Sequence, residues 1–207
     1  VLLKCLLGLH IPDDGEILYD GISNKEMTEN QKTLLRREMG MVFQGSALFD
    51  SMTVLENVMF PLKMLTQKDE SEIYEKAENA IRRVELDNAQ QKLPSELSGG
   101  MQKRVAIARA IVMNPKYLFC DEPNSGLDPV TAIVIDELIK EITDEFNMTT
   151  VVITHDMNSV LEIGENILFI DDGVNKWVGN KNEILDVKVK ELYDFIYVSK
   201  FLQQMKK

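Results

Sequence analysis

Residues 117–123 read YLFCDEP, an apolar run followed directly by two carboxylates, Asp121 and Glu122. A short continuous apolar run is typical of a strand that is buried on both faces of a parallel sheet. In open α/β sheets, ligands bind beyond the carboxyl ends of the strands. The stretch therefore predicts a buried parallel strand whose tip carries two carboxylates, Asp121 and Glu122, which are suited to a metal and a base.

A small-residue turn that opens a helix precedes this strand. Residues 97–104 read LSGGMQKR, and Ser98, Gly99 and Gly100 stand at the predicted helix start. Serine is a favoured N-cap residue, and glycine lets another group approach the backbone closely. The first N–H groups of a helix lack intrahelical partners, and the helix dipole favours an anion beside them. The turn is therefore suited to bind phosphate oxygens.

Three more polar segments stand at the ends of predicted strands. Residues 124–129 (NSGLDP) follow the carboxylates at once, Gln44 ends the apolar run 39–43, and His155 ends the β-branched run 149–154. Alone, each is weak evidence, since a histidine or glutamine after a strand is usually an ordinary loop residue. The other histidine, His10, is expected to be solvated.

In this order, the segments resemble the motifs of ABC (ATP-binding cassette) ATPases. LSGGMQKR resembles their signature motif, YLFCDEP the Walker B strand and SGLDP the D-loop, while Gln44 and His155 match the Q-loop glutamine and the switch histidine. The resemblance implies a P-loop NTPase-like α/β fold with a largely parallel sheet, flanking helices and an inserted helical lobe. The alternation of strands and helices favours the same fold class. Within a single domain we expect a catalytic lobe of residues 1–44 and 115–207 and a helical lobe of residues 45–114.

The resemblance also implies ATP and Mg²⁺ as cofactors and assigns catalytic roles. Asp121 would hold Mg²⁺, largely through water, and Gln44 would contact the metal and the attacking water. Glu122 would polarise that water, and His155 would contact the γ-phosphate and orient the water.

The remaining assigned residues concern a second ATPase subunit in a homodimer. The signature residues would bind the γ-phosphate of the ATP that the opposite subunit holds, and Asp128 of the D-loop would arrange water and contacts across the interface. The signature residues assigned here are Ser98, Gly99, Gly100 and Gln102.

One motif of the family does not occur in this sequence. The phosphate loop, G-x-x-x-x-G-K-[ST], supplies the lysine and the backbone amides that hold the β- and γ-phosphates. Residues 1–10 (VLLKCLLGLH) resemble the helix that normally follows it. We therefore expect a sequence truncated after the phosphate loop, without the preceding strands, which by itself binds ATP poorly and hydrolyses it negligibly.

Composition narrows the class of protein. Of the 207 residues, 44% are hydrophobic and 28% are charged, which is ordinary for a globular domain. No apolar run reaches the roughly 18–20 residues that span a bilayer. The net charge of −11 argues against nucleic acid as a partner. Cys5 and Cys120 are expected to be buried thiols of a cytoplasmic protein.

Segments beyond the shared motifs suggest a branch of the family. Residues 45–54 (GSALFDSMTV) and 56–62 (ENVMFPL) resemble the ATPase of bacterial Mla-type phospholipid transporters. This implies a subunit that lies peripherally on the inner membrane, through a permease that moves lipid. An ABC ATPase that imports another small substrate remains an alternative, as does a non-transport one. A DNA-repair or chromosome-structuring ATPase would carry a long coiled coil between Gln44 and Ser98, and a translation factor would have two cassettes. Because the sequence lacks the phosphate loop, a non-enzymatic interaction module also remains an alternative.

Apolar residues gather just after Gln44, and we expect them to divide between the core and a groove that receives a short permease helix. They are Leu48, Phe49, Met52, Val54, Val58, Met59 and Phe60. The helix over 53–65 is expected to be interrupted near Pro61, Thr28 and Gln31 to cap a helix that runs to Glu38, and residues 188–204 to form a C-terminal helix.

Overall fold

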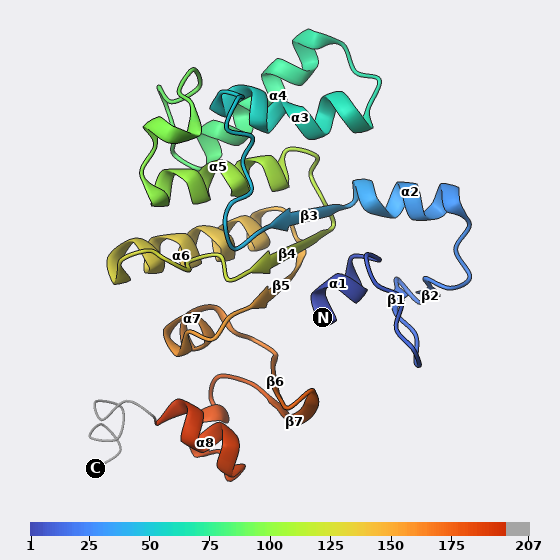
Figure 1. Cartoon of the computed structure of the whole chain (residues 1–207), viewed down its shortest axis with the longest axis vertical. Helices are drawn as coiled ribbons and strands as arrows, with labels where there is room; N and C mark the ends of the chain where they lie inside the picture. Colours follow the sequence, from blue (N-terminus) through green and yellow to red (C-terminus); the bar gives the residue numbers. More distant parts are fainter. Residues whose placement is uncertain (198–207) are drawn as a thin grey trace. The chain divides into compact units, whose positions relative to one another are not determined.

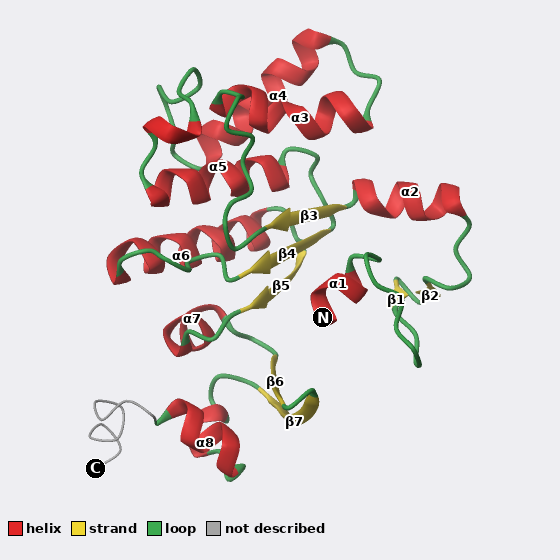
Figure 2. Cartoon of the chain, viewed as in Figure 1, coloured by secondary structure: helices red, strands yellow, loops and turns green. Residues whose placement is uncertain are grey.

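A computed structural model describes residues 1–197 of the chain, which divide into two compact units, Val1–Ile153 and the described residues from Thr154 onward. The first unit contains a parallel sheet of three strands in the order β3–β4–β5 (Figures 1 and 2). These strands are Met39–Val42, Tyr117–Asp121 and Thr149–Ile153. The α/β fold predicted from the sequence is confirmed.

The central strand β4 shows why the apolar run is continuous. Leu118 and Cys120 belong to the main core on one face of the sheet, while Tyr117 and Phe119 pack with Leu3 of α1 (Leu2–Leu6) in a separate cluster. Successive side chains of a strand point to opposite faces, so both faces of β4 are covered. Burial raises the pKa of the Cys120 thiol to about 12. Cys5, predicted to be buried, is only half-buried.

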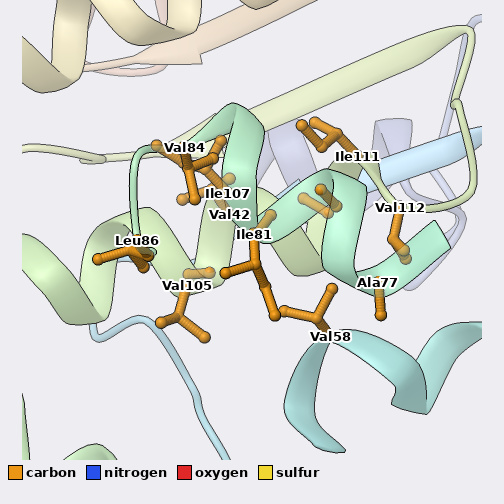
Figure 3. Close-up of a cluster of buried hydrophobic side chains, with 14 of the residues drawn as sticks. Val42, Val58, Ala77, Ile81, Val84, Leu86, Val105, Ile107, Ile111 and Val112 are labelled. Atoms are coloured by element: carbon orange, nitrogen blue, oxygen red, sulfur yellow. The ribbon is translucent and has the colours of Figure 1, made fainter. Parts of the chain in front are cut away.

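The segment between β3 and β4 contains helices joined by loops and has no strand. It contains α3 (Val54–Leu65), α4 (Glu70–Arg83), the 3₁₀ turn η1 (Pro94–Glu96) and α5 (Gly99–Ile111). Helices α3, α4 and α5 pack on one another, and α5 also packs on β3 and on α6 (Pro129–Glu145). Figure 3 shows their shared core, with Val58, Ile81 and Ile107 among the labelled side chains.

Helix α3 corrects one prediction, because it runs unbroken through Pro61. Proline removes one helical hydrogen bond, but Val58, Met59 and Leu62 of the same helix are buried in the core. Packing of that face outweighs the missing bond. The predicted cap of α2 (Glu29–Arg37) is confirmed, since Thr28 and Gln31 form a reciprocal capping box.

The N-terminal part of the first unit also contains a short antiparallel pair, β1 (Leu18–Tyr19) and β2 (Ile22–Ser23). The second unit has a hairpin of β6 (Ile167–Asp171) and β7 (Val174–Gly179), with α7 (Met157–Ile163), the turn η2 (Ile184–Asp186) and α8 (Lys190–Ile196). The predicted C-terminal helix over 188–204 corresponds in part to α8, and its end lies outside the described residues. In the described part of the chain, no helix is both long and apolar enough to cross a bilayer.

Candidate functional site

The carboxyl ends of the parallel strands bring the predicted catalytic residues of the first unit to one edge. Val42 is level with Cys120 across β3 and β4, so Gln44 and the pair Asp121–Glu122 leave the sheet at the same end. The Gln44 amide nitrogen lies 3.4 Å from Ser125 Oγ, three residues after Glu122. Gln44 and the loop that follows the two carboxylates therefore lie close together at this edge.

The backbone at Glu122 has an unusual conformation. Its φ of 48° lies in the left-handed region, which a residue with a Cβ rarely adopts. Neighbouring hydrogen bonds keep it there: the Glu122 N–H donates to the Ile153 carbonyl at 2.8 Å, and the Ser125 N–H donates to the Glu122 carbonyl at 3.1 Å. Backbone strain of this kind occurs at functional sites, although eight other non-glycine residues of the described chain also have a positive φ.

The oxygen ligands at this edge of the sheet are of the kind that Mg²⁺ binds. Among the described residues, no three His, Cys, Asp or Glu side chains gather closely enough to hold a metal. Magnesium needs no such cage, because it keeps several waters and binds one or two carboxylates together with substrate phosphates. The Asp121 carboxylate at the strand tip, with the Gln44 amide at the same edge, fits that pattern.

The signature residues stand at the N-terminus of α5. Ser98 is the N-cap, and its Oγ accepts a hydrogen bond from the Met101 N–H at 3.3 Å. Ser98 and Gly99 are exposed, so the start of the helix is open to a ligand. Gly100 has an internal role as well, because a Cβ there would lie 2.7 Å from Thr131 Cγ2 of α6.

Gln102 and Asp128 make contacts within the chain. The Gln102 amide donates to the Pro94 carbonyl at 3.0 Å, so it braces the loop before the signature. Asp128 is the N-cap of α6, and its carboxylate accepts from the Val130 and Thr131 N–H groups. The Thr131 hydroxyl and N–H hold the pKa of Asp128 below its usual range. The ligand roles predicted for both residues stay predictions.

His155 follows β5 but lies in the second unit, so its predicted approach to the γ-phosphate stays a prediction. His10 is exposed, as expected for a solvated residue.

Sequence reasoning missed two residues that anchor the Q-loop, here residues 44–53 between β3 and α3. The Asn57 carboxamide, fully buried, donates to the Phe49, Met52 and Thr53 carbonyls and accepts from the Phe49 N–H. The Arg109 guanidinium donates to the Ser46 and Ala47 carbonyls at 2.7 Å each. For Asn57 the signal was a polar residue on the apolar face of a predicted helix, which requires buried partners.

A third missed residue is Lys103, which is 4% exposed and whose ammonium contacts the carbonyls of Gln44 and Glu122. Its spacing from Ala106, Ile107 and Ala110 places it on the buried face of α5. The same periodicity is visible in the sequence.

A cavity of about 280 Å³ lies beside the Q-loop in the first unit. Its apolar lining includes Phe49 and Phe60, whose ring centroids are 4.6 Å apart. Arg36, Arg37 and Arg109 also line it. Of the apolar residues predicted near Gln44, three are core, namely Val54, Val58 and Met59.

With this geometry in hand, comparison with known proteins identifies the family. The family model described as "ABC transporter" matches residues 1–125, which is more than half of the chain. The chain belongs to this family of ATP-binding cassettes.

Curated relatives of the chain are transport ATP-binding proteins. It is 40% identical over 167 residues to the probable ribonucleotide transport ATP-binding protein mkl of Mycobacterium leprae, covering 81% of this chain and 48% of the relative. It is 42% identical over 170 residues to the methionine import ATP-binding protein MetN of Clostridium tetani, covering 82% and 53%. The chain thus spans about half the length of these relatives.

Solved structures agree with the fold. CbiO1 from Clostridium perfringens, described as part of an ABC transporter complex, matches with a TM-score of 0.83 and 30% identity, covering all of this chain and 82% of that one. The dimeric cassette MJ0796 bound to ADP and Pi matches with a TM-score of 0.76 and 34% identity, covering 87% and 79%.

Proposed function

We propose that the full-length gene product is the ATP-hydrolysing subunit of an ABC transporter. The observation that carries the proposal is the common edge at which Gln44 lies against the loop that follows Asp121 and Glu122. A metal-binding carboxylate, a base and a water-orienting amide in one place are the groups that phosphoryl transfer to water requires. Family membership and the transport functions named for the relatives support this reading.

In this proposal Asp121 and Gln44 hold Mg²⁺ with ATP, and Glu122 polarises the attacking water. Mg²⁺ supplies charge neutralisation at the phosphates, while the protein positions the reacting groups. The start of α5 in a second copy of the chain completes the site. There Ser98, Gly99 and Gly100 face the γ-phosphate of the ATP that the first copy binds. The exposed helix terminus supports this arrangement, and so does the likeness to a cassette solved as a dimer.

The test of the catalytic assignment is Glu122→Gln in the full-length protein. The amide keeps the size and polarity of the side chain, so ATP binding survives, but turnover falls by roughly two to four orders of magnitude with the loss of the base. The matched control is Glu137→Gln, an exposed position on α6 that should keep wild-type turnover. Turnover of Glu122→Gln within about threefold of wild type would contradict the assignment of the base.

The partner we propose is a membrane permease that inserts a short apolar helix with an acidic residue into the cavity beside the Q-loop. The Phe49 and Phe60 rings supply the apolar surface, and Arg36, Arg37 and Arg109 supply the complementary charge. The cavity adjoins the loop that carries Gln44, so a movement of this loop would change the contacts of a helix bound in the cavity.

Phe49→Asp tests this docking site. Phe49 is 39% exposed, so the variant is expected to fold and to keep basal ATPase activity while losing co-purification with the permease. Met64→Asp is the control, since Met64 lies on α3 but outside the cavity and is 66% exposed. Unchanged co-purification of Phe49→Asp would place the docking surface elsewhere.

The cargo proposed from residues 45–62 is phospholipid. The relatives reported above are named for ribonucleotide transport and methionine import, which are the competing classes. ATPase stimulation of the purified complex by phospholipid vesicles, measured beside stimulation by a ribonucleotide and by methionine, distinguishes the three. No response to phospholipid would contradict the lipid proposal.

A further inference from the structure

Lys103 is a buried lysine between two catalytic loops. It lies on α5 and is 4% exposed. Its Nζ donates to the Gln44 carbonyl oxygen and lies 3.5 Å from the Glu122 carbonyl oxygen. These two carbonyls belong to different loops, one after β3 and one after β4, so a single ammonium joins both.

A lysine is rarely buried unless its charge is compensated, because an ammonium loses its hydration on burial. Burial lowers the pKa of Lys103, and the Glu122 carboxylate opposes that shift. An apolar residue of the same length would fill this space without the cost of a buried charge. The contacts with the two loops therefore give the position a role beyond packing.

We propose that Lys103 is a positioning residue that holds the Gln44 and Glu122 peptides in the geometry needed for ATP hydrolysis. This inference rests on the ATPase function proposed above. A hydrogen bond to a carbonyl orients the peptide plane, and the peptide plane sets the direction of the attached side chain. Lys103 thus acts on the metal-contacting amide and on the base without touching the substrate.

The position of Lys103 on α5 connects the proposed nucleotide site of the second subunit with the two loops that carry Gln44 and Glu122. The helix begins at Ser98, which faces the ATP of the second subunit in the proposed dimer, and Lys103 is five residues further on. Because a helix is stiff over this distance, a shift of its start when the partner's nucleotide binds moves Lys103 as well. The helix therefore links the partner's nucleotide to the chain's own catalytic loops.

The test compares Lys103→Met with Lys103→Arg in the full-length protein. Methionine keeps the length but has no donor, so kcat should fall by about 10- to 100-fold, as expected for misplaced catalytic groups. The KM for ATP should stay within about threefold, and the melting temperature should be unchanged or higher, since a buried charge is removed. Arginine restores the charge and the donors and should recover part of kcat. Lys140→Met, at an exposed position of α6, is the matched control and should change nothing.

A second background isolates the route through Gln44. In Gln44→Ala the positioned amide is gone, so adding Lys103→Met should lower kcat by a smaller factor than it does in the wild type.

The inference is overturned if Lys103→Met keeps kcat within twofold of wild type, or if kcat falls only in proportion to lost folded protein. It is also overturned if Lys103→Arg, folded to the same degree, is as slow as Lys103→Met. If methionine prevents folding, Lys103→Leu, which also has no donor, takes the same assays and the same criteria. Normal turnover of Glu122→Gln would instead contradict the proposed ATPase site itself, so the two failures are distinguishable.

Discussion

Replacing Gly100 with alanine should strain the packing of α5 against α6. The added Cβ would lie 2.7 Å from Thr131 Cγ2, whereas carbon atoms in good contact are about 3.5–4 Å apart. Thr131 cannot turn away freely, because its Oγ1 donates to Asp128 Oδ2 at 2.6 Å. The clash must move the helix or force Thr131 off its rotamer, and overpacking of this kind costs about 1–3 kcal/mol.

Gly99→Ala is the matched control for this prediction. A Cβ at Gly99 would meet Leu127 Cδ2 at 3.4 Å, which is an ordinary contact. Both substitutions gain helix propensity, by at most about 1 kcal/mol, so this gain nearly cancels between neighbouring positions. We therefore expect Gly100→Ala to be less stable than Gly99→Ala by about 1–2 kcal/mol.

Urea unfolding of the two variants measures this difference, read from the midpoints at equal slope. Thr131→Ser removes the clashing methyl group and keeps the hydroxyl that bonds to Asp128, so Gly100→Ala in that background should regain most of the lost stability. Equal stability of the two alanine variants, or no recovery with Thr131→Ser, would refute the reasoning.

Three further predictions concern Asn57, Asp128 and Ser98. Asn57→Ala removes the partner of several buried backbone groups and should lower the free energy of unfolding by about 2–4 kcal/mol in urea titrations; a loss below about 1 kcal/mol would contradict its anchoring role. The pKa of Asp128 is held low in the folded state, so its contribution is present above about pH 4 and is lost as the pH falls through the folded pKa. On acidification from about pH 6 to about pH 3, wild type should therefore lose more stability than Asp128→Asn, and parallel curves would disprove the contribution. Ser98→Arg in the full-length protein should abolish turnover yet leave equilibrium ATP binding of the isolated subunit intact, since the obstructed phosphate site belongs to the second subunit; substantial remaining turnover would argue against that site.

The sequence was most informative where local chemistry dictates structure. The YLFCDEP run predicted a buried strand with carboxylates at its tip, and β4 ends at Asp121. The reciprocal capping by Thr28 and Gln31 was predictable as well, because both partners lie within one helical turn. Motif order then identified the family, since no single motif carries that much information.

What the sequence did not reveal depends on contacts between distant segments. The interruption expected near Pro61 ignored the packing of α3 on α4 and α5, which decides whether the helix continues. The basic residues of α5 could be assigned to a helix, but not to their partners. Lys103 and Arg109 contact segments about sixty residues earlier in the chain, at Gln44, Ser46 and Ala47, and no local pattern encodes such a pairing.

Through these contacts, α5 connects three parts of the proposed transporter. In the proposed dimer its first turn would face the second subunit's nucleotide. Its middle contacts the loops after β3 and β4 through Lys103, and its last turn contacts Ser46 of the Q-loop through Arg109. Arg109 also lies over the Phe49 ring, 6.0 Å from its centroid, at the cavity proposed for the permease. Because one rigid helix touches all three places, nucleotide binding at its start and permease docking at its end would, in this proposal, be coupled through the backbone of residues 44–49. Substitution of Arg109 should therefore reduce the stimulation of ATPase activity by the permease more than it reduces basal ATPase activity. Substitution of Lys103 should lower both the basal and the stimulated activity.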